Sequence, residues 1–198
     1  NLRWIDQRPF YFLARLALAG SALDLGSLRE DSGLINQATQ LYLDVSGMVP
    51  HSWEMWNRLG EVYLQIGQPA EALGPLEKSL AITGHKPYSN TAWRLKVRAY
   101  HQLGRSQQSI ADLGEAIQAN PVQDELYYLR GTTYYELGNN EAAIRDLSQA
   151  IHISPRYSEA LYARGIVYYE LGQYRNSVED MDQVIRLDPR HVSAYNNR

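Results

Sequence analysis

The C-terminal half of the sequence repeats itself with a fixed period, and this repetition constrains the fold more than any other feature. The segments 127–155 and 161–189 carry matching residues, and every match is 34 positions apart. The matching residues are Arg130-Gly131 and Arg164-Gly165, Tyr134 and Tyr168, Gly138 and Gly172, and Pro155 and Pro189. A period of this length indicates similar units stacked in a row, each contacting mainly its neighbours.

Glycine and proline predict where the helices of each unit end. The glycines that end a first helix, where a left-handed residue closes the last turn, are Gly67, Gly104, Gly138 and Gly172. The prolines that stop a second helix are Pro121, Pro155 and Pro189. A third set lacks a side chain and lets the paired helix approach closely: Gly60, Gly131 and Gly165. Each unit is therefore predicted to be a helix, a turn and a second helix.

Departures from the period predict local differences. The step from Gly67 to Gly104 is 37 residues, so we place three extra residues in the loop 84–89. Val97 replaces the glycine of the close contact, so that helix pair should sit further apart. Pro75 falls inside a second helix and predicts a kink. Before position 53, apolar spacing predicts helices over about 9–25 and 34–46, with a polar break at 30–33.

The units resemble the tetratricopeptide repeat family. Trp56, Leu59-Gly60 and Tyr63, followed by Ala72 and Leu76, fit its signature with its spacing. The resemblance divides residues 53–191 into four repeats, at 53–89, 90–123, 124–157 and 158–191. Residues 1–52 form a divergent N-terminal helical hairpin, and 192–198 begin a further repeat or cap. The resemblance implies an all-α fold, a right-handed α-solenoid of helix–turn–helix repeats.

The composition argues against several classes of function. A net charge of −3 and a pI near 6.0 do not provide the basic surface that nucleic-acid binding needs. No cysteine is present, which excludes disulfides, thiolate zinc sites and cysteine nucleophiles and fits either redox compartment. The five histidines are scattered, and the glycines are spaced as helix ends, not as a phosphate loop. We therefore expect no catalytic site, metal site or small-molecule cofactor.

The resemblance implies that the first helices of the repeats line a concave groove that receives a peptide or a partner helix. The candidate groove residues are Asn57, Glu61, Arg94, Arg98, His101, Glu125, Tyr128, Tyr135, Glu136, Tyr162, Ile166 and Tyr169. Their chemistry is graded: Arg94 and Arg98 are basic, and Tyr128, Tyr135, Tyr162 and Tyr169 form a tyrosine ladder edged with glutamates. An acidic part of the ligand would face the arginines, and a basic or apolar part the ladder. Alternatively, the tyrosines simply pack on each other.

Other roles remain open at this stage. Chaperone-binding members of the family grip a terminal carboxylate with Lys, Asn and Arg, but the corresponding positions here include Glu61, Leu95 and Glu125. We therefore predict that this chain is not such a carboxylate clamp. The chain stops inside a pattern, so we take it as a piece of a longer protein. We expect its uncovered C-terminal face to be sticky in isolation, and some end-to-end association to result from the truncation. Besides a protein-binding scaffold, two alternatives stay open. The chain could be a structural module that associates with itself, or the accessory repeat region of a larger enzyme or membrane protein.

Overall fold

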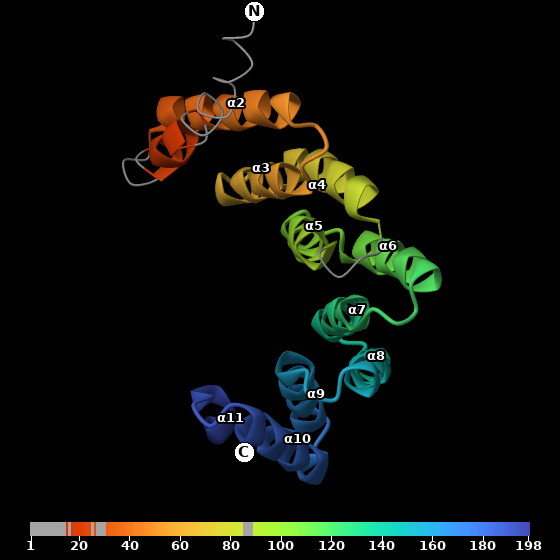
Figure 1. Ribbon diagram of the computed structural model, residues 1–198. Coiled ribbons are helices and arrows are strands. Elements are labelled where there is room, and N and C mark those ends of the chain that lie inside the picture. Colours follow the sequence, from red (N-terminus) through yellow and green to blue (C-terminus); the bar gives the residue numbers. More distant parts are fainter. Residues whose placement is uncertain (1–14, 16, 25, 27–30, 85–88) are drawn as a thin grey trace, which may run out of the picture. The chain divides into compact units, whose positions relative to one another are not determined.

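A computed structural model describes residues 15, 17–24, 26, 31–84 and 89–198, and its regular structure there is helical (Figure 1). The helices are α2 (Ser32–Met48), α3 (Trp53–Gln65), α4 (Pro69–Thr83), α5 (Asn90–Gln102), α6 (Ser106–Ala119), α7 (Asp124–Glu136), α8 (Asn140–Ile153), α9 (Ser158–Glu170), α10 (Tyr174–Leu187) and α11 (Val192–Asn196). Among the described helices, none combines the length and the apolar character needed to cross a bilayer.

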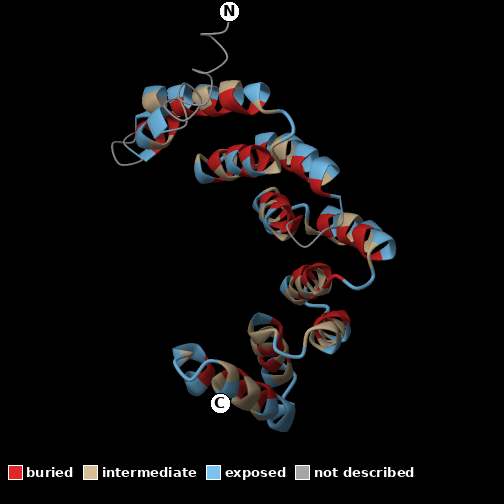
Figure 2. Cartoon of the chain, viewed as in Figure 1, coloured by how far each residue is buried: buried red, intermediate tan, exposed pale blue. Residues whose placement is uncertain are grey.

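The helices group into two compact units, residues 1–103 and 104–198. In the first unit α2 packs on α3, α3 on α4 and α4 on α5. In the second unit each helix from α6 to α10 packs on the next one along the chain, and α10 packs on α11. Figure 2 shows buried residues on one side of most helices and exposed residues on the other. Contacts between chain neighbours are what the 34-residue period predicts; the predicted handedness of the solenoid stays a prediction.

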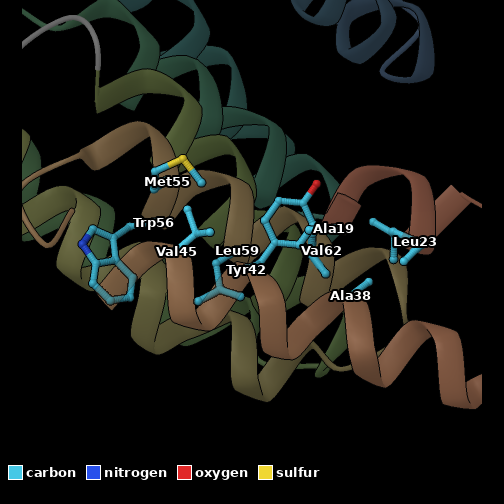
Figure 3. Packing of buried hydrophobic residues seen from close by; sticks show 10 residues of the cluster. Ala19, Leu23, Ala38, Tyr42, Val45, Met55, Trp56, Leu59 and Val62 are labelled. Carbon is cyan, nitrogen blue, oxygen red and sulfur yellow. The ribbon is translucent and has the colours of Figure 1, made fainter. Parts of the chain in front are cut away.

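The N-terminal hairpin packs on the first regular helix pair. Residues 17–24 are helical, while the ends of the predicted helix 9–25 lie outside the described residues. Ala19 and Leu23 are buried against Tyr42 of α2 and Leu59 of α3 (Figure 3). The helix predicted over 34–46 begins two residues earlier, because Asp31 caps it: the Asp31 carboxylate accepts the backbone N–H groups of Gly33 at 2.9 Å and Leu34 at 3.2 Å.

The predicted close helix contacts at three glycines are confirmed. A Cβ at Gly60 would lie 2.6 Å from Leu76 Cδ2, and one at Gly165 would lie 2.7 Å from Met181 Cε. At Gly131 the Cβ would lie 2.9 Å from Leu147 Cγ and 3.2 Å from the Leu147 backbone nitrogen. In all three cases the partner belongs to the second helix of the same pair. At Gly131, where the backbone of Leu147 is also close, a side chain requires the two helices to shift apart, whereas at Gly60 and Gly165 the side chain of the partner must move.

The predicted helix ends are also confirmed. The φ angles of Gly67, Gly104, Gly138 and Gly172 are 74°, 67°, 76° and 71°, all in the left-handed region. The helices α6, α8 and α10 end at Ala119, Ile153 and Leu187, each two residues before a proline. Glycine is needed at the first set because other residues adopt that backbone conformation only with strain.

The three extra residues lie around the connection between α4 and α5. That connection, 84–89, has six residues, whereas 120–123, 154–157 and 188–191 have four each. The remaining extra residue belongs to α4, which has 15 residues against 14 in α6, α8 and α10. The helix α4 runs through Pro75 without a break. The kink at Pro75 and the wider spacing at Val97 stay predictions.

Candidate interaction surface

The candidate groove residues fall into three groups by exposure. Arg94, Arg98, Glu136 and Tyr169 are exposed; Glu61, His101, Tyr128, Tyr135, Tyr162 and Ile166 are half-buried; Asn57 and Glu125 are buried. The tyrosine ladder is therefore not sealed from solvent, and Tyr169 is 57% exposed. Half-buried tyrosines present part of a large amphipathic ring, which is the form in which tyrosine contributes to interfaces.

Glu125 does not form the free acidic edge that the sequence suggests. It is 3% exposed, and its Oε2 atom accepts a hydrogen bond of 2.7 Å from the hydroxyl of Tyr157. Tyr157 lies in the connection that leads into α9, so it reaches back to the start of α7. The carboxylate is thus engaged inside the second unit, which leaves Glu136 and Glu170 as the exposed acids that flank Tyr135 in this unit.

The sequence prediction that Asn57 lies on the groove surface is also wrong. It is only 5% exposed, because α3 has neighbours on several sides: α2, α4 and α5 all pack against it. The amide oxygen and nitrogen of Asn57 have no hydrogen-bond partner within the described residues. A buried residue of this kind cannot offer its amide to a ligand at the surface, so we remove Asn57 from the candidate surface.

Tyr135 is held by a residue from the next helix pair. Its hydroxyl donates a 2.6 Å hydrogen bond to Glu170 Oε1, across from α7 to the end of α9. This bond to the carboxylate, helped by burial and by the negative charge, raises the pKa of Tyr135 to about 12. The contact ties neighbouring first helices together and fixes the orientation of one ring of the ladder.

Two other tyrosines of the ladder, Tyr128 and Tyr162, are fixed by a contact that recurs with the period. Tyr128 packs on Tyr157 with ring centroids 5.1 Å apart, and Tyr162 packs on His191 at 5.0 Å. These are the same two positions in successive repeats, because each member is shifted by 34 residues. Tyr162 also accepts a 2.8 Å hydrogen bond from the side-chain amide of Asn197. The rings are thus positioned before any ligand arrives, which reduces the ordering cost of binding.

Among the described residues no group of three or more His, Asp and Glu side chains is arranged to hold a metal ion. The arrangement offers positioned aromatic rings, hydroxyls and carboxylates on first helices. Such groups recognise another molecule by shape, hydrogen bonds and charge.

Sequence profiles of the tetratricopeptide repeat match nearly the whole described chain. One matches residues 23–90, another, the TPR repeat, matches 98–138 and 131–172, and a third matches 158–191. The chain belongs to the tetratricopeptide repeat family. No curated protein gave a significant sequence match.

Solved structures of tetratricopeptide repeat proteins share the fold. The crystal structure of MamA is 24% identical, with 85% of this chain and 96% of that chain covered and a TM-score of 0.59. The thermophilic protein TTC0263 of Thermus thermophilus is 21% identical, with 90% and 95% covered and a TM-score of 0.65. The first TPR of Spaghetti (RPAP3), solved bound to an HSP90 peptide, is 22% identical, with 56% and 88% covered and a TM-score of 0.51.

One recurring feature of these tetratricopeptide repeats was missed by the sequence reasoning. Arg130 Nε and Nη2 contact the two carboxylate oxygens of Asp146 at 2.6 and 2.9 Å. Arg164 contacts Asp180 in the same way, at 2.9 and 2.7 Å, and also donates to Ser148 Oγ at 3.0 Å. The repeated arginines are evident in the sequence, and the signal for their partners is that Asp146 and Asp180 also repeat at 34 residues.

Proposed function

We propose that this tetratricopeptide repeat chain is a non-catalytic protein-interaction scaffold, and that the face of α7 and α9 in the second unit binds a peptide or a helix of another protein. The observation that carries the proposal is the tyrosine ladder, whose rings are half-buried or exposed and already positioned by neighbouring side chains. Positioned tyrosines contribute strongly to interface energies at a low entropic cost. The peptide bound to the first TPR of RPAP3 supports the idea that this fold can hold such a ligand.

The charges on this face favour a ligand with basic and apolar residues. Glu136, Glu159 and Glu170 are exposed on α7 and α9. Opposite charge on the ligand gives register and speeds association, while the rings supply apolar contact area. We therefore propose a ligand segment in which Lys or Arg alternates with apolar or aromatic residues.

The first unit would contribute a positively charged contact, in contrast to the acidic residues of α7 and α9. Arg94 and Arg98 are both exposed on α5, four residues apart and so on one side of the helix. We propose that they receive an acidic part of a protein ligand. Changing both to Glu should weaken an acidic ligand and leave the thermal melt nearly unchanged, since exposed charges contribute little stability. A variant that fails to fold would show that the pair is structural.

A substitution within the repeat register tests the ladder directly. Tyr128 and Tyr135 occupy the positions that Arg94 and His101 hold one repeat earlier, so the changes Tyr128→Arg and Tyr135→His use residues that this scaffold already accepts. Peptides selected from a random displayed library on the natural chain should be rich in basic and apolar residues. We expect the double variant to lose at least about ten-fold in affinity for them, as hot-spot tyrosines do.

A matched control introduces the same two residue types, arginine and histidine, on a second helix. The variant with Gln118→Arg and Gln108→His adds the same groups to exposed positions of α6. It should bind the selected peptides as the natural chain does. Equal loss in both variants, or selection of acidic peptides that bind the second unit, would contradict the proposal.

A further inference from the structure

The tyrosine ladder has a regular spacing, and this spacing limits the backbone conformations that a bound ligand can have. Tyr128 and Tyr135 are seven residues apart on α7, and Tyr162 and Tyr169 are seven residues apart on α9. Seven residues are close to two helical turns, so both members of a pair lie on one side of their helix with a rise of about 10.5 Å between them. A ligand that contacts both rings with equivalent residues needs a repeat near this length.

Three common backbone conformations differ in this repeat. Residues on one side of a β-strand recur every 6.6 to 6.8 Å or so, and then at about 13 Å, which misses the spacing of the ladder. An α-helix returns to the same side after two turns at about 10.8 Å. A polyproline II helix, with three residues per turn and a rise of 3.1 Å, returns after about 9.3 Å. The spacing therefore argues against a strand and fits an α-helix or a polyproline II helix.

The hydroxyl of Tyr162 distinguishes these two conformations. Its oxygen accepts the 2.8 Å hydrogen bond from the Asn197 side-chain amide, and within the described residues its own O–H group has no acceptor. The backbone carbonyls of an α-helix are bonded internally, whereas those of a polyproline II helix point outward. Proline also has no N–H group that would need an acceptor on this face. A polyproline II ligand thus supplies the carbonyl that the Tyr162 hydroxyl can reach.

The acidic residues of α9 select the side chains that accompany the prolines. Glu159 precedes Tyr162 by three residues, and Glu170 directly follows Tyr169; both glutamates are exposed. Carboxylates at these positions favour Lys or Arg on the ligand by charge complementarity. Grooves lined by aromatic rings are also the surfaces on which proline-rich segments dock, because the rings contact the flat apolar proline side chains.

We propose that the tyrosine ladder binds a proline-rich segment of a partner protein in the polyproline II conformation, with Lys or Arg along one side of the segment. The prolines pack on the rings, the basic residues face Glu159 and Glu170, and a ligand carbonyl accepts the Tyr162 hydroxyl. This inference rests on the proposed function of the same face and adds the chemical class of the ligand. Because such a segment is largely preformed, little entropy is lost when it binds.

The probe is a labelled synthetic peptide of four Lys-Pro-Pro units, and two control peptides replace either proline by alanine or lysine by glutamate. Fluorescence anisotropy with the full chain should show saturable binding of the probe, about ten-fold or more tighter than binding of either control. Tyr128→Arg with Tyr135→His should weaken the probe by about ten-fold or more. The matched control, Gln118→Arg with Gln108→His, should leave its affinity unchanged.

A second pair of variants tests the hydroxyl alone. Tyr162→Phe keeps the ring and removes the donor, so it should weaken the Lys-Pro-Pro peptide by about three- to ten-fold, as the loss of one hydrogen bond does. Tyr174→Phe is its matched control, because Tyr174 is an exposed residue of α10 outside the ladder, and affinity should not change.

The possible failures separate this inference from the proposed function. Equal binding of the proline and alanine peptides, or no loss with Tyr162→Phe, would overturn the inference. Library-selected peptides that lack proline but depend on Tyr128 and Tyr135 would also overturn it, while the proposed function would stand. If neither those peptides nor the Lys-Pro-Pro peptide depended on the two tyrosines, the proposed function would fail as well.

Discussion

At the scale of single residues, the repeat positions differ in how directly the sequence reveals their role. Gly60, Gly131 and Gly165 could be predicted as close helix contacts because the absence of a side chain is itself the signal. The ion pairs of Arg130 and Arg164 are less direct, because the arginine alone does not say which acid it meets, and the only clue is that Asp146 and Asp180 repeat at the same 34-residue spacing. In the first repeat the same two positions hold Leu59 and Pro75, so the fold accepts an apolar pair there as well.

Replacing a glycine by leucine should have opposite effects on stability at a close helix contact and at an exposed helical position. Gly131→Leu should lower the free energy of unfolding by about 1–3 kcal/mol, because the new Cβ meets the side chain and backbone of Leu147. Gly47→Leu, in an exposed position of α2 with open space at its Cβ, should raise it by up to about 1 kcal/mol through helix propensity. Urea unfolding measures both, and an unchanged midpoint for Gly131→Leu would refute the tight contact.

The buried ion pair predicts a large cost when one partner is neutralised. Asp180 is 2% exposed, so Asp180→Asn leaves the Arg164 guanidinium without its counter-charge and should cost about 3–5 kcal/mol. The exposed pair Arg175–Glu179 is the comparison, and Glu179→Gln should change the unfolding free energy by less than about 0.5 kcal/mol. If the two variants unfolded alike, the Arg164–Asp180 pair would have no structural role.

The Tyr135–Glu170 bond predicts a pH dependence. Because the pKa of Tyr135 is raised from 10.0 to about 12, the neutral phenol is favoured in the folded state. Its contribution to stability is full below pH 10.0 and is lost as the pH rises through about 12. Glu170→Ala should lower the pKa of this phenol toward its ordinary value. Phenolate absorbance, assigned with Tyr135→Phe, measures the change; identical titrations with and without Glu170 would contradict the bond.

At the scale of helices and connections, spacing predicted which elements form and roughly where they end. It did not predict that Asp31 starts α2, or that one of the three extra residues extends α4, because such boundaries depend on local hydrogen bonds. Spacing also placed the stripe of first-helix residues. It failed at Asn57 and Glu125, whose burial depends on neighbouring helices and on Tyr157, 32 residues further along the chain.

Helix termination by left-handed glycines gives a prediction at this scale. Gly138→Ala should cost about 1–2 kcal/mol, since its φ of 76° strains any residue with a Cβ although no atom lies near that Cβ. Gly47→Ala is the control, because Gly47 is an exposed residue within α2 that also has open space at its Cβ, and this change should be neutral or stabilising. Chemical unfolding compares them, and equal effects would contradict termination by backbone conformation.

At the scale of the whole molecule, the period predicted similar units that pack on their chain neighbours, and the family resemblance implied that these units are all-α. The two compact units bear this out, each with its own buried clusters. The identity of the ligand does not follow from the period, because the period reports how the helices pack and not which molecule contacts their exposed residues. We propose that α7 and α9, with the four tyrosines of the ladder, form the ligand-binding face of this chain.

The most direct test of that claim is amide chemical-shift mapping on the natural chain during titration with a peptide selected from the displayed library. Our account predicts that the largest shifts fall on α7 and α9, around Tyr128, Tyr135 and Tyr162, with little change along the exposed faces of α8 and α10. Shifts concentrated on those second helices, with the tyrosine ladder undisturbed, would contradict it.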